Sequence, residues 1–167
     1  MIAVERHSRD AKLLAQEFDN DPQVSVLEED GYHVLKSHLP PRERRGLVLI
    51  DPAYELRDET KRLLQGLADG CRRWPTGIYA IWYPIMPKIA VAQLHRELIA
   101  SEIRKTMVTE LCIYPDDNPL GLNGSGIIIV NPPWKLDEEL RTLLPWLWQR
   151  LSADGQGRYR VEWLVPE

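Results

Sequence analysis

Short aliphatic runs alternate with longer amphipathic segments along most of this 167-residue sequence. Such alternation is typical of βα units, which build a mostly parallel sheet covered by helices on both faces. We therefore predict an α/β fold in a single domain over residues 1–167, because a chain of this length is too short for two comfortable cores. Strands are predicted at Ile2–Glu5, Val24–Leu27, Gly46–Ile50, Gly77–Tyr83, Met107–Tyr114, Gly126–Val130 and Tyr159–Val165. Helices are predicted at Ser8–Phe18, Tyr32–Leu39, Asp58–Arg73, Lys88–Ser101 and Asp137–Leu151.

Local signals add detail to this outline. Asp58 is placed to cap the first turn of its helix, and apolar residues recur behind it at helical spacing, so that face should lie on the sheet. Pro145 cannot donate a backbone hydrogen bond, which predicts a kink or a break in the last helix. The loop GLNGSG (121–126) joins two strand runs directly and therefore predicts an antiparallel hairpin at one edge of the sheet.

The net charge and the positions of the cysteines limit the kinds of ligand and site that this chain is expected to have. The formal net charge of −4 means that the chain as a whole does not attract phosphate, so any nucleic-acid contact must come from local basic patches. Cys71 and Cys112 lie far apart without metal-ligand spacing, and we expect buried reduced thiols and no metal site. No signal peptide or membrane-spanning run is visible, so we expect a soluble, cytoplasmic protein.

The run LVLIDPAYE (47–55) is an aliphatic strand that ends abruptly on Asp51. Ligands of open α/β sheets bind beyond the carboxyl ends of the strands, so this turn is well placed for chemistry. The Asp51 carboxylate and the Pro52 carbonyl can accept hydrogen bonds from an exocyclic amino group, and the Tyr54 ring can stack on a base swung out of its helix. The alternative is a plain strand-to-helix turn in which Asp51 caps, Pro52 breaks the strand and Tyr54 packs.

A second copy of the pattern is formed by Asn131, Pro132, Pro133 and Trp134 after the run GIIIV (126–130). It matches the bare pattern better, but it follows the predicted hairpin instead of a central parallel strand. Two prolines there are typical of an edge strand that ends before a helix. We therefore favour a structural role for Asn131, whose side chain is expected to tie the edge strand to the helix that begins at Asp137.

Acidic residues also follow the two strands that precede Asp51. Glu5 closes the first strand, where an acid in nucleoside-binding α/β folds accepts hydrogen bonds from ribose hydroxyls. Asp30 and Gly31 follow the second strand, where a carboxylate and a backbone amide can read an adenine edge. Taken singly, Asp30 is better explained as a helix N-cap. The order Glu5, Asp30, Asp51 on three successive strand ends favours the functional interpretation.

Other polar and aromatic residues are weaker candidates. His95 lies on a predicted helix without a nucleophile as partner, and we expect it to face solvent. Trp82, Tyr83 and Pro84 end a central strand beside the Asp51 turn, where core packing is the default and a stacking wall is the alternative. The absence of a Ser–His or Cys–His arrangement with catalytic spacing disfavours a hydrolase.

Five separated motifs occur in a specific order: LPPRERRGLVLIDPAYE, TGIYAIWYP, GSGIIIVNPPWKL, LPWL and WLVPE. Together they resemble the carboxyl-terminal part of the bacterial 23S ribosomal RNA adenine-N6 methyltransferase J family, whose members are also described as proteins needed to use external DNA as a nutrient. The resemblance covers essentially the whole chain. It implies a Rossmann-like methyltransferase fold, S-adenosylmethionine as methyl donor, and one adenine of 23S ribosomal RNA as substrate.

The resemblance also implies a role for each candidate residue. Asp51 corresponds to the catalytic acid of the family, although the family pattern is Asp-Pro-Pro-Tyr and this chain has Ala53 in the third place. The remaining assignments are Pro52, Ala53 and Tyr54 for substrate binding, and Glu5, Asp30 and Gly31 for cofactor binding.

The resemblance further implies a domain that is incomplete at its amino terminus. The family's amino-terminal segment, its glycine-rich cofactor loop and its inserted helical subdomain have no counterpart in this sequence. The alternative function, from another class, is a non-catalytic nucleic-acid interaction protein involved in the use of external DNA. Binding of S-adenosylmethionine separates the two functions.

Overall fold

A computed structural model describes residues 1–54, 58–86, 91–115, 118, 121–152 and 155–167. The predicted α/β class is confirmed, and each predicted strand and helix is present with bounds shifted by a few residues; the predicted start of one helix at Lys88 lies outside the described residues. The elements are β1 (Ile2–Glu5), α1 (Ser8–Glu17), β2 (Ser25–Glu28), α2 (Gly31–Ser37), β3 (Leu47–Ile50), α3 (Glu59–Arg73), β4 (Ile78–Ile85), α4 (Val91–Ala100), β5 (Thr106–Cys112), β6 (Gly124–Val130), α5 (Leu136–Leu151) and β7 (Arg158–Val165).

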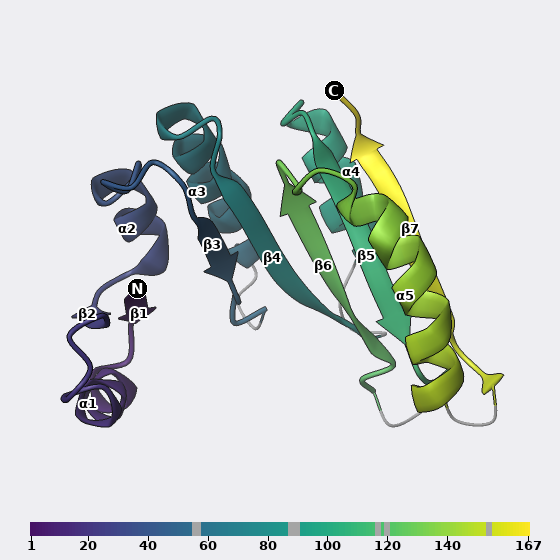
Figure 1. Cartoon of the computed structure of the whole chain (residues 1–167), viewed down its shortest axis with the longest axis horizontal. Helices are drawn as coiled ribbons and strands as arrows, with labels where there is room; N and C mark the ends of the chain where they lie inside the picture. The colour runs from purple at the N-terminus through teal and green to yellow at the C-terminus, as the bar shows by residue number, and fades with distance from the viewer. Residues whose placement is uncertain (55–57, 87–90, 116–117, 119–120, 153–154) are drawn as a thin grey trace.

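The strands form two sheets (Figure 1). β1 and β2 make a parallel pair, and the larger sheet has the order β3-β4-β6-β5-β7. Within the larger sheet only β3 and β4 are parallel neighbours; the pairs β4–β6, β6–β5 and β5–β7 are antiparallel. The prediction of a mostly parallel sheet is therefore wrong for the larger sheet.

The position of β6 explains this difference. As the βα pattern predicts, α3 and α4 connect strands that run in the same direction. α3 connects the parallel neighbours β3 and β4. α4 connects β4 and β5, which are both antiparallel to β6. The predicted hairpin of β5 and β6 is confirmed, but β6 folds back into the space between β4 and β5 instead of lying at the sheet edge. The inserted strand β6 thus gives two antiparallel pairs in place of one parallel pair of β4 with β5, and the edge strand β7 adds a third antiparallel pair.

The main core lies between the larger sheet and the helices α3 and α4, which Figure 1 shows together on one face of that sheet. Leu63 and Leu67 of α3 are 1% and 0% exposed, which confirms that the predicted apolar face of this helix lies on the sheet. They pack in one cluster with alternate residues of β4, such as Tyr79 and Ile81, because successive strand residues point to opposite faces. Asp58 is the N-cap residue of α3, although its side chain makes no capping hydrogen bond.

Helix α5 lies on the opposite face of the sheet, next to β5 and β7 (Figure 1). It continues through Pro145, so of the predicted kink or break, the break is wrong. Leu144 is buried beside the proline, and packing of the helix against β5 and β7 holds it together where one hydrogen bond is lost. Among the described residues, no helix combines the length and the apolar character needed to cross a membrane.

Candidate functional site

The Asp51 turn begins at the carboxyl end of β3. Because Ile50 lies opposite Ile81 in the parallel pairing of β3 with β4, the turn emerges beside Trp82. Asp51 is exposed, whereas the next residue, Pro52, is buried. The Asp51 carboxylate therefore faces solvent, while the backbone that follows it is packed into the protein. Tyr54 adopts a left-handed conformation with φ of 43°. Few non-glycine residues do so, which indicates that surrounding contacts hold the turn in this shape.

Tyr54 supplies such a contact. Its hydroxyl donates a hydrogen bond of 2.7 Å to the backbone carbonyl of Trp82, and the two rings meet edge to face with centroids 6.4 Å apart. Burial raises the pKa of Tyr54, and the carboxylates of Asp51 and Glu59 raise it further, so the phenol stays protonated and keeps donating. The hydroxyl of Tyr54 therefore anchors the turn to β4, and its ring is partly buried against the core.

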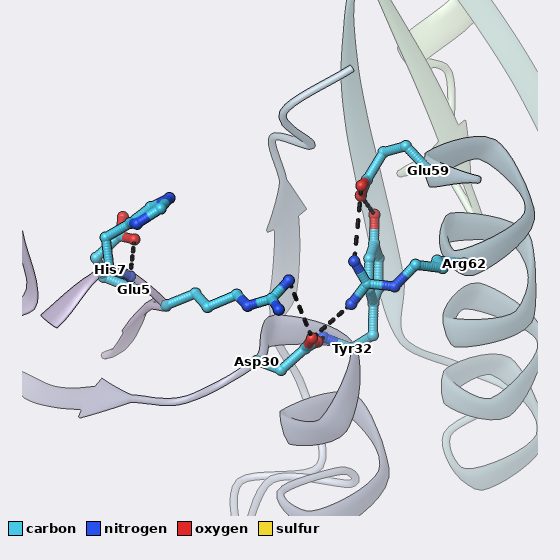
Figure 2. A network of polar contacts seen from close by, with 7 residues as sticks. Glu5, His7, Asp30, Tyr32, Glu59 and Arg62 are labelled. Carbon is cyan, nitrogen blue, oxygen red and sulfur yellow. Dashed lines mark hydrogen bonds and ion pairs between the residues drawn. The ribbon is translucent and has the colours of Figure 1, made fainter. Parts of the chain in front are cut away.

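Glu5 and Asp30 follow the carboxyl ends of β1 and β2, which are parallel neighbours with Glu5 opposite Glu28. The Glu5 carboxylate accepts a hydrogen bond of 2.7 Å from the backbone amide of His7, and the residue is partly buried at the end of its strand (Figure 2). Asp30 is the N-cap residue of α2, where its Oδ1 accepts a 2.9 Å hydrogen bond from the amide of Tyr32. The structural interpretation of Asp30 is therefore confirmed.

Asp30 also belongs to a charged network that the sequence did not reveal. Its Oδ2 lies 2.5 Å from Nη2 of Arg62 on α3 and 4.0 Å from Nη1 of Arg6, directly after β1 (Figure 2). Through Asp30, the ends of β1 and β2 are thus joined to the first turns of α3. Asp51 lies near this network, since its carboxylate and that of Glu59 both act on the Tyr54 hydroxyl.

Glu59, Tyr32 and Arg62 complete this network. Glu59 is only 5% exposed, and its Oε1 accepts a 2.6 Å hydrogen bond from the Tyr32 hydroxyl while Oε2 lies 3.8 Å from Arg62. The Arg62 guanidinium stands 5.2 Å from the centre of the Tyr32 ring. Burial and the hydrogen bond to Glu59 both raise the pKa of Tyr32. The Tyr32 hydroxyl therefore stays protonated and continues to donate to the Glu59 carboxylate. The sequence signal for this network, an acid and an arginine three residues apart at a helix start, is too common to identify it.

Asn131 lies at the other end of β4 from the Asp51 turn. β6 is antiparallel to β4 with Val130 opposite Tyr79, so its carboxyl end meets the start of β4. The Asn131 side-chain amide donates two 2.8 Å hydrogen bonds, to the carbonyls of Pro75 and Gly77. The structural role is right, but the predicted partner is wrong: the side chain holds the turn before β4, and not the helix that begins near Asp137.

His95 is buried, so the prediction that it faces solvent is also wrong. Its Nε2 lies 3.1 Å from the Tyr83 hydroxyl, which donates a 2.7 Å hydrogen bond to the buried carboxylate of Glu110. Position 95 lies beside Leu94 and Leu98 on the face of α4 that covers the sheet, and the polar groups beneath it make burial possible. Tyr83 is a core residue, as expected by default.

The two cysteines lie on α3 and β5. Cys112 is buried as predicted, whereas Cys71 is only partly buried, and both are thiols. Burial raises the pKa of the Cys71 thiol to about 11. In the described part of the chain, no three His, Cys, Asp or Glu side chains are placed to share a metal ion.

The residues implied to bind a nucleoside cofactor fit that role unequally. Glu5 fits it, since the carboxylate of this partly buried residue lies at a strand end and can accept hydrogen bonds from hydroxyl groups. Gly31 also fits, because a Cβ placed there would meet nothing within 4 Å, so the chain's own packing does not demand a glycine. The Asp30 carboxylate is already engaged by the amide of Tyr32 and the guanidinium of Arg62, so it fits direct contact with a cofactor less well.

The α/β fold, with acidic residues at the ends of three strands, is consistent with a methyltransferase fold. Comparison with known proteins agrees: the family described as Ribosomal RNA large subunit methyltransferase D, RlmJ, matches residues 1–165. The chain belongs to this family.

Individual relatives support the same assignment. The chain is 42% identical over 163 residues to the Ribosomal RNA large subunit methyltransferase J of Escherichia coli (strain K12), which covers 98% of this chain and 58% of the relative. The protein of the same name from Haemophilus influenzae is 39% identical over 166 residues, with coverage of 99% and 59%. A crystal structure of a Legionella pneumophila protein superposes with a TM-score of 0.83 at 30% identity, covering 97% of this chain and 60% of that one. The chain thus spans about three fifths of the length of these relatives.

Proposed function

We infer that the chain provides the substrate-orienting part of an S-adenosylmethionine-dependent methyltransferase, which modifies N6 of one adenine in 23S ribosomal RNA in the cytoplasm. Family membership supports methyl transfer to ribosomal RNA as the general activity. The observation that carries the finer assignment is the exposed Asp51 carboxylate at the end of β3, next to the buried Pro52 and an anchored Tyr54. An acid, a carbonyl and an aromatic ring in one turn match the two hydrogens and the flat face of an aminopurine.

Each group of the turn has a distinct task in this proposal. The Asp51 carboxylate accepts one hydrogen of the adenine amino group and the Pro52 carbonyl accepts the other, which directs the nitrogen lone pair away from the turn. Tyr54 offers its ring to the base while its hydroxyl holds the turn against β4. S-adenosylmethionine, when bound, supplies the electrophilic methyl group. Most of the catalytic effect assigned to these residues is orientation, with the proton leaving the amine after transfer.

Glu5, Gly31 and Asp30 serve the cofactor side of the proposal. Glu5 would accept from ribose hydroxyls, and the open space over Gly31 would admit the nucleoside close to the backbone. Asp30 positions this edge by pairing with Arg62 and capping α2. The three residues share the strand-end side of the molecule that the Asp51 turn also occupies.

The proposal is tested on ribosomal RNA from a strain that lacks the gene. Mass spectrometry of 23S ribosomal RNA fragments should show the loss of one N6-methyladenine, which returns when the wild-type gene is supplied on a plasmid. The Asp51→Ala gene should not restore it, although its product accumulates at the wild-type level. Retention of every N6-methyladenine in the deleted strain would refute the proposal.

A calorimetric titration separates methyl transfer from a purely nucleic-acid-binding role. The purified 167-residue chain is titrated with S-adenosylmethionine, with adenosine monophosphate as the control for unspecific nucleotide binding. We expect the cofactor to bind, and more weakly to a Glu5→Gln variant. Equal affinity of wild type and Glu5→Gln for both nucleotides would count against the cofactor role of this strand end.

A further inference from the structure

The two ends of the larger sheet carry different loops. β3 and β4 start together at one end, because they pair in parallel. Val130, the last residue of β6, lies opposite both Tyr79, near the start of β4, and Thr106, the first residue of β5. The Asp51 turn leaves the opposite end, where β3 stops. β4 is eight residues long, so the two ends are roughly 25 Å apart at about 3.3 Å per residue.

Three loops meet at the end where β3 and β4 start, and hydrogen bonds tie them to one another. Arg73, the last residue of α3, donates from Nε to the carbonyl of Leu39, 3.0 Å away in the loop before β3. The amide of Ile78 donates to the carbonyl of Gly46 in the same loop, at 3.4 Å. The Asn131 side chain donates to two carbonyls of the turn before β4. The loop before β3, the end of α3 and the turn after β6 are therefore held side by side.

These loops carry exposed basic side chains and one exposed aromatic ring. We call the group the amino-end surface, and it consists of Arg42, Arg44, Arg45, Arg72, Arg73, Trp134 and Lys135. The acids beside it are Glu43, Asp69, Glu138 and Glu139. Asp69 is buried and paired with Lys36 and Arg72. Basic residues outnumber the acids here, although the whole chain has a net charge of −4. Contact of such a chain with nucleic acid requires a local basic patch of this kind.

The backbone of these loops holds cations in conformations that favour glycine. Arg44 and Lys135 are left-handed, with φ of 56° and 63°. A Cβ disfavours this region of backbone conformation, whereas glycine adopts it freely. Both residues are exposed, so burial of the side chain does not explain their positions. Residues that keep a disfavoured conformation without a packing reason are candidates for a function.

Trp134 stands among these cations. It is 86% exposed, more than any other large apolar side chain of the described residues, and Nζ of Lys135 lies 4.5 Å from the centre of its ring. Proteins that bind single-stranded nucleic acid combine the same two elements. Bases stack on exposed aromatic rings, and basic side chains follow the phosphates between them.

We propose that the amino-end surface binds a single-stranded stretch of the ribosomal RNA substrate. One base stacks on Trp134, and the arginines contact the neighbouring phosphates. The identity of the RNA rests on the proposed function. Because the Asp51 turn lies at the other end of the sheet, the surface holds a different segment of the same RNA from the one that carries the target adenine. Binding energy from such a remote contact is the same before and during methyl transfer, so it lowers KM and leaves kcat unchanged.

Filter binding measures the contact, with end-labelled, unmodified 23S ribosomal RNA from the strain that lacks the gene. Arg44→Glu/Arg45→Glu should weaken binding at least tenfold. The slope of log affinity against log salt should become smaller by about 1.4, the value for two phosphates of a single strand. Lys12→Glu/Arg150→Glu makes the same change of charge at exposed positions on α1 and α5 and should bind as wild type does. Equal affinity of the two double variants would overturn the proposal.

Two tryptophans provide a second matched comparison. Trp134→Ala should weaken RNA binding by between about five- and hundredfold without changing the salt slope, since stacking releases no counterions. Trp146→Ala removes a side chain that is 55% exposed on α5, outside the surface, and should bind normally. Unchanged binding by Trp134→Ala would overturn the stacking role and with it the proposal.

Glycine variants separate this role from a structural one. Arg44→Gly/Lys135→Gly relieves two left-handed positions, so it should keep or raise the melting temperature while weakening RNA binding. A lower melting temperature with unchanged binding would assign both cations to the fold and overturn the proposal. Asp51→Ala should bind the RNA as wild type does. If the surface variants lose RNA binding but the strain without the gene keeps every N6-methyladenine, the proposed function fails and the binding surface stands.

Discussion

The hydroxyl of Tyr54 donates a hydrogen bond of 2.7 Å to the backbone carbonyl of Trp82, which joins the turn after β3 to the neighbouring strand β4. This bond fixes Tyr54, whose φ of 43° is left-handed, and with it the turn that carries Asp51. Tyr54→Phe keeps the ring and removes the bond, so we expect a loss of about 0.5–1.5 kcal/mol in the free energy of unfolding. Urea unfolding measures this loss. Methylation of 23S ribosomal RNA by the variant, in the strain lacking the gene, should fall but not vanish, because the ring and Asp51 remain.

The two similar turns should respond in opposite ways to alanine. Asp51 is exposed, so Asp51→Ala should change stability by less than about 0.5 kcal/mol and abolish methyl transfer. Asn131→Ala loses the two bonds to Pro75 and Gly77 and should cost about 1–3 kcal/mol without altering transfer per folded molecule. Melting temperature and N6-methyladenine content are measured for both. An active Asp51→Ala beside an inactive, stable Asn131→Ala would assign the chemistry to the other turn.

The buried His95 should make stability depend on pH. Burial lowers the pKa of His95 from about 6.5, an effect that the nearby Glu110 partly offsets. As pH falls below about 6.5, the unfolded chain binds this proton before the native protein does, so the native state loses stability. The loss approaches roughly 1.4 kcal/mol per pH unit until the native pKa is reached.

His95→Gln isolates this contribution from the titration of the carboxylates. The difference in unfolding free energy between wild type and His95→Gln is measured at pH 7.5 and pH 5.5. We expect the advantage of wild type to shrink at the lower pH. An advantage that grows instead would mean that His95 becomes charged more easily in the folded protein, through its neighbour Glu110.

Gly126 and Gly31 differ in whether the surrounding packing leaves room for a side chain. A Cβ on Gly126 would lie 2.1 Å from Cζ of the buried Tyr83, so Gly126→Ala should destabilise the protein severely, by more than about 3 kcal/mol. Gly31→Ala meets nothing within 4 Å and should leave the melting temperature almost unchanged. If the nucleoside occupies the space over Gly31, this variant binds S-adenosylmethionine more weakly, and titration calorimetry measures the change. Unchanged affinity would remove Gly31 from the cofactor site.

The sequence by itself determined the secondary structure and the family. Helical spacing of Leu63 and Leu67, and aliphatic runs such as the one before Asp51, are properties of neighbouring residues, and all the predicted elements formed. Five motifs in order were sufficient to identify the methyltransferase family, which the comparison over residues 1–165 confirms. Secondary structure can be predicted in this way because the side-chain periodicity of helices and strands involves residues only a few positions apart.

Only the tertiary structure decided how these elements meet. The insertion of β6 between β4 and β5 determined which neighbours are antiparallel, and it moved Asn131 to the end of β4 remote from Asp51. Packing of α4 onto the sheet buried His95 above Tyr83, and the fold brought Asp30 against Arg62, 32 positions away. The exposure of Leu47 and Leu49 likewise depends on which part of the sheet α5 covers, and that is a property of the tertiary structure. Such outcomes depend on contacts between residues distant in sequence, whose energies no local pattern contains.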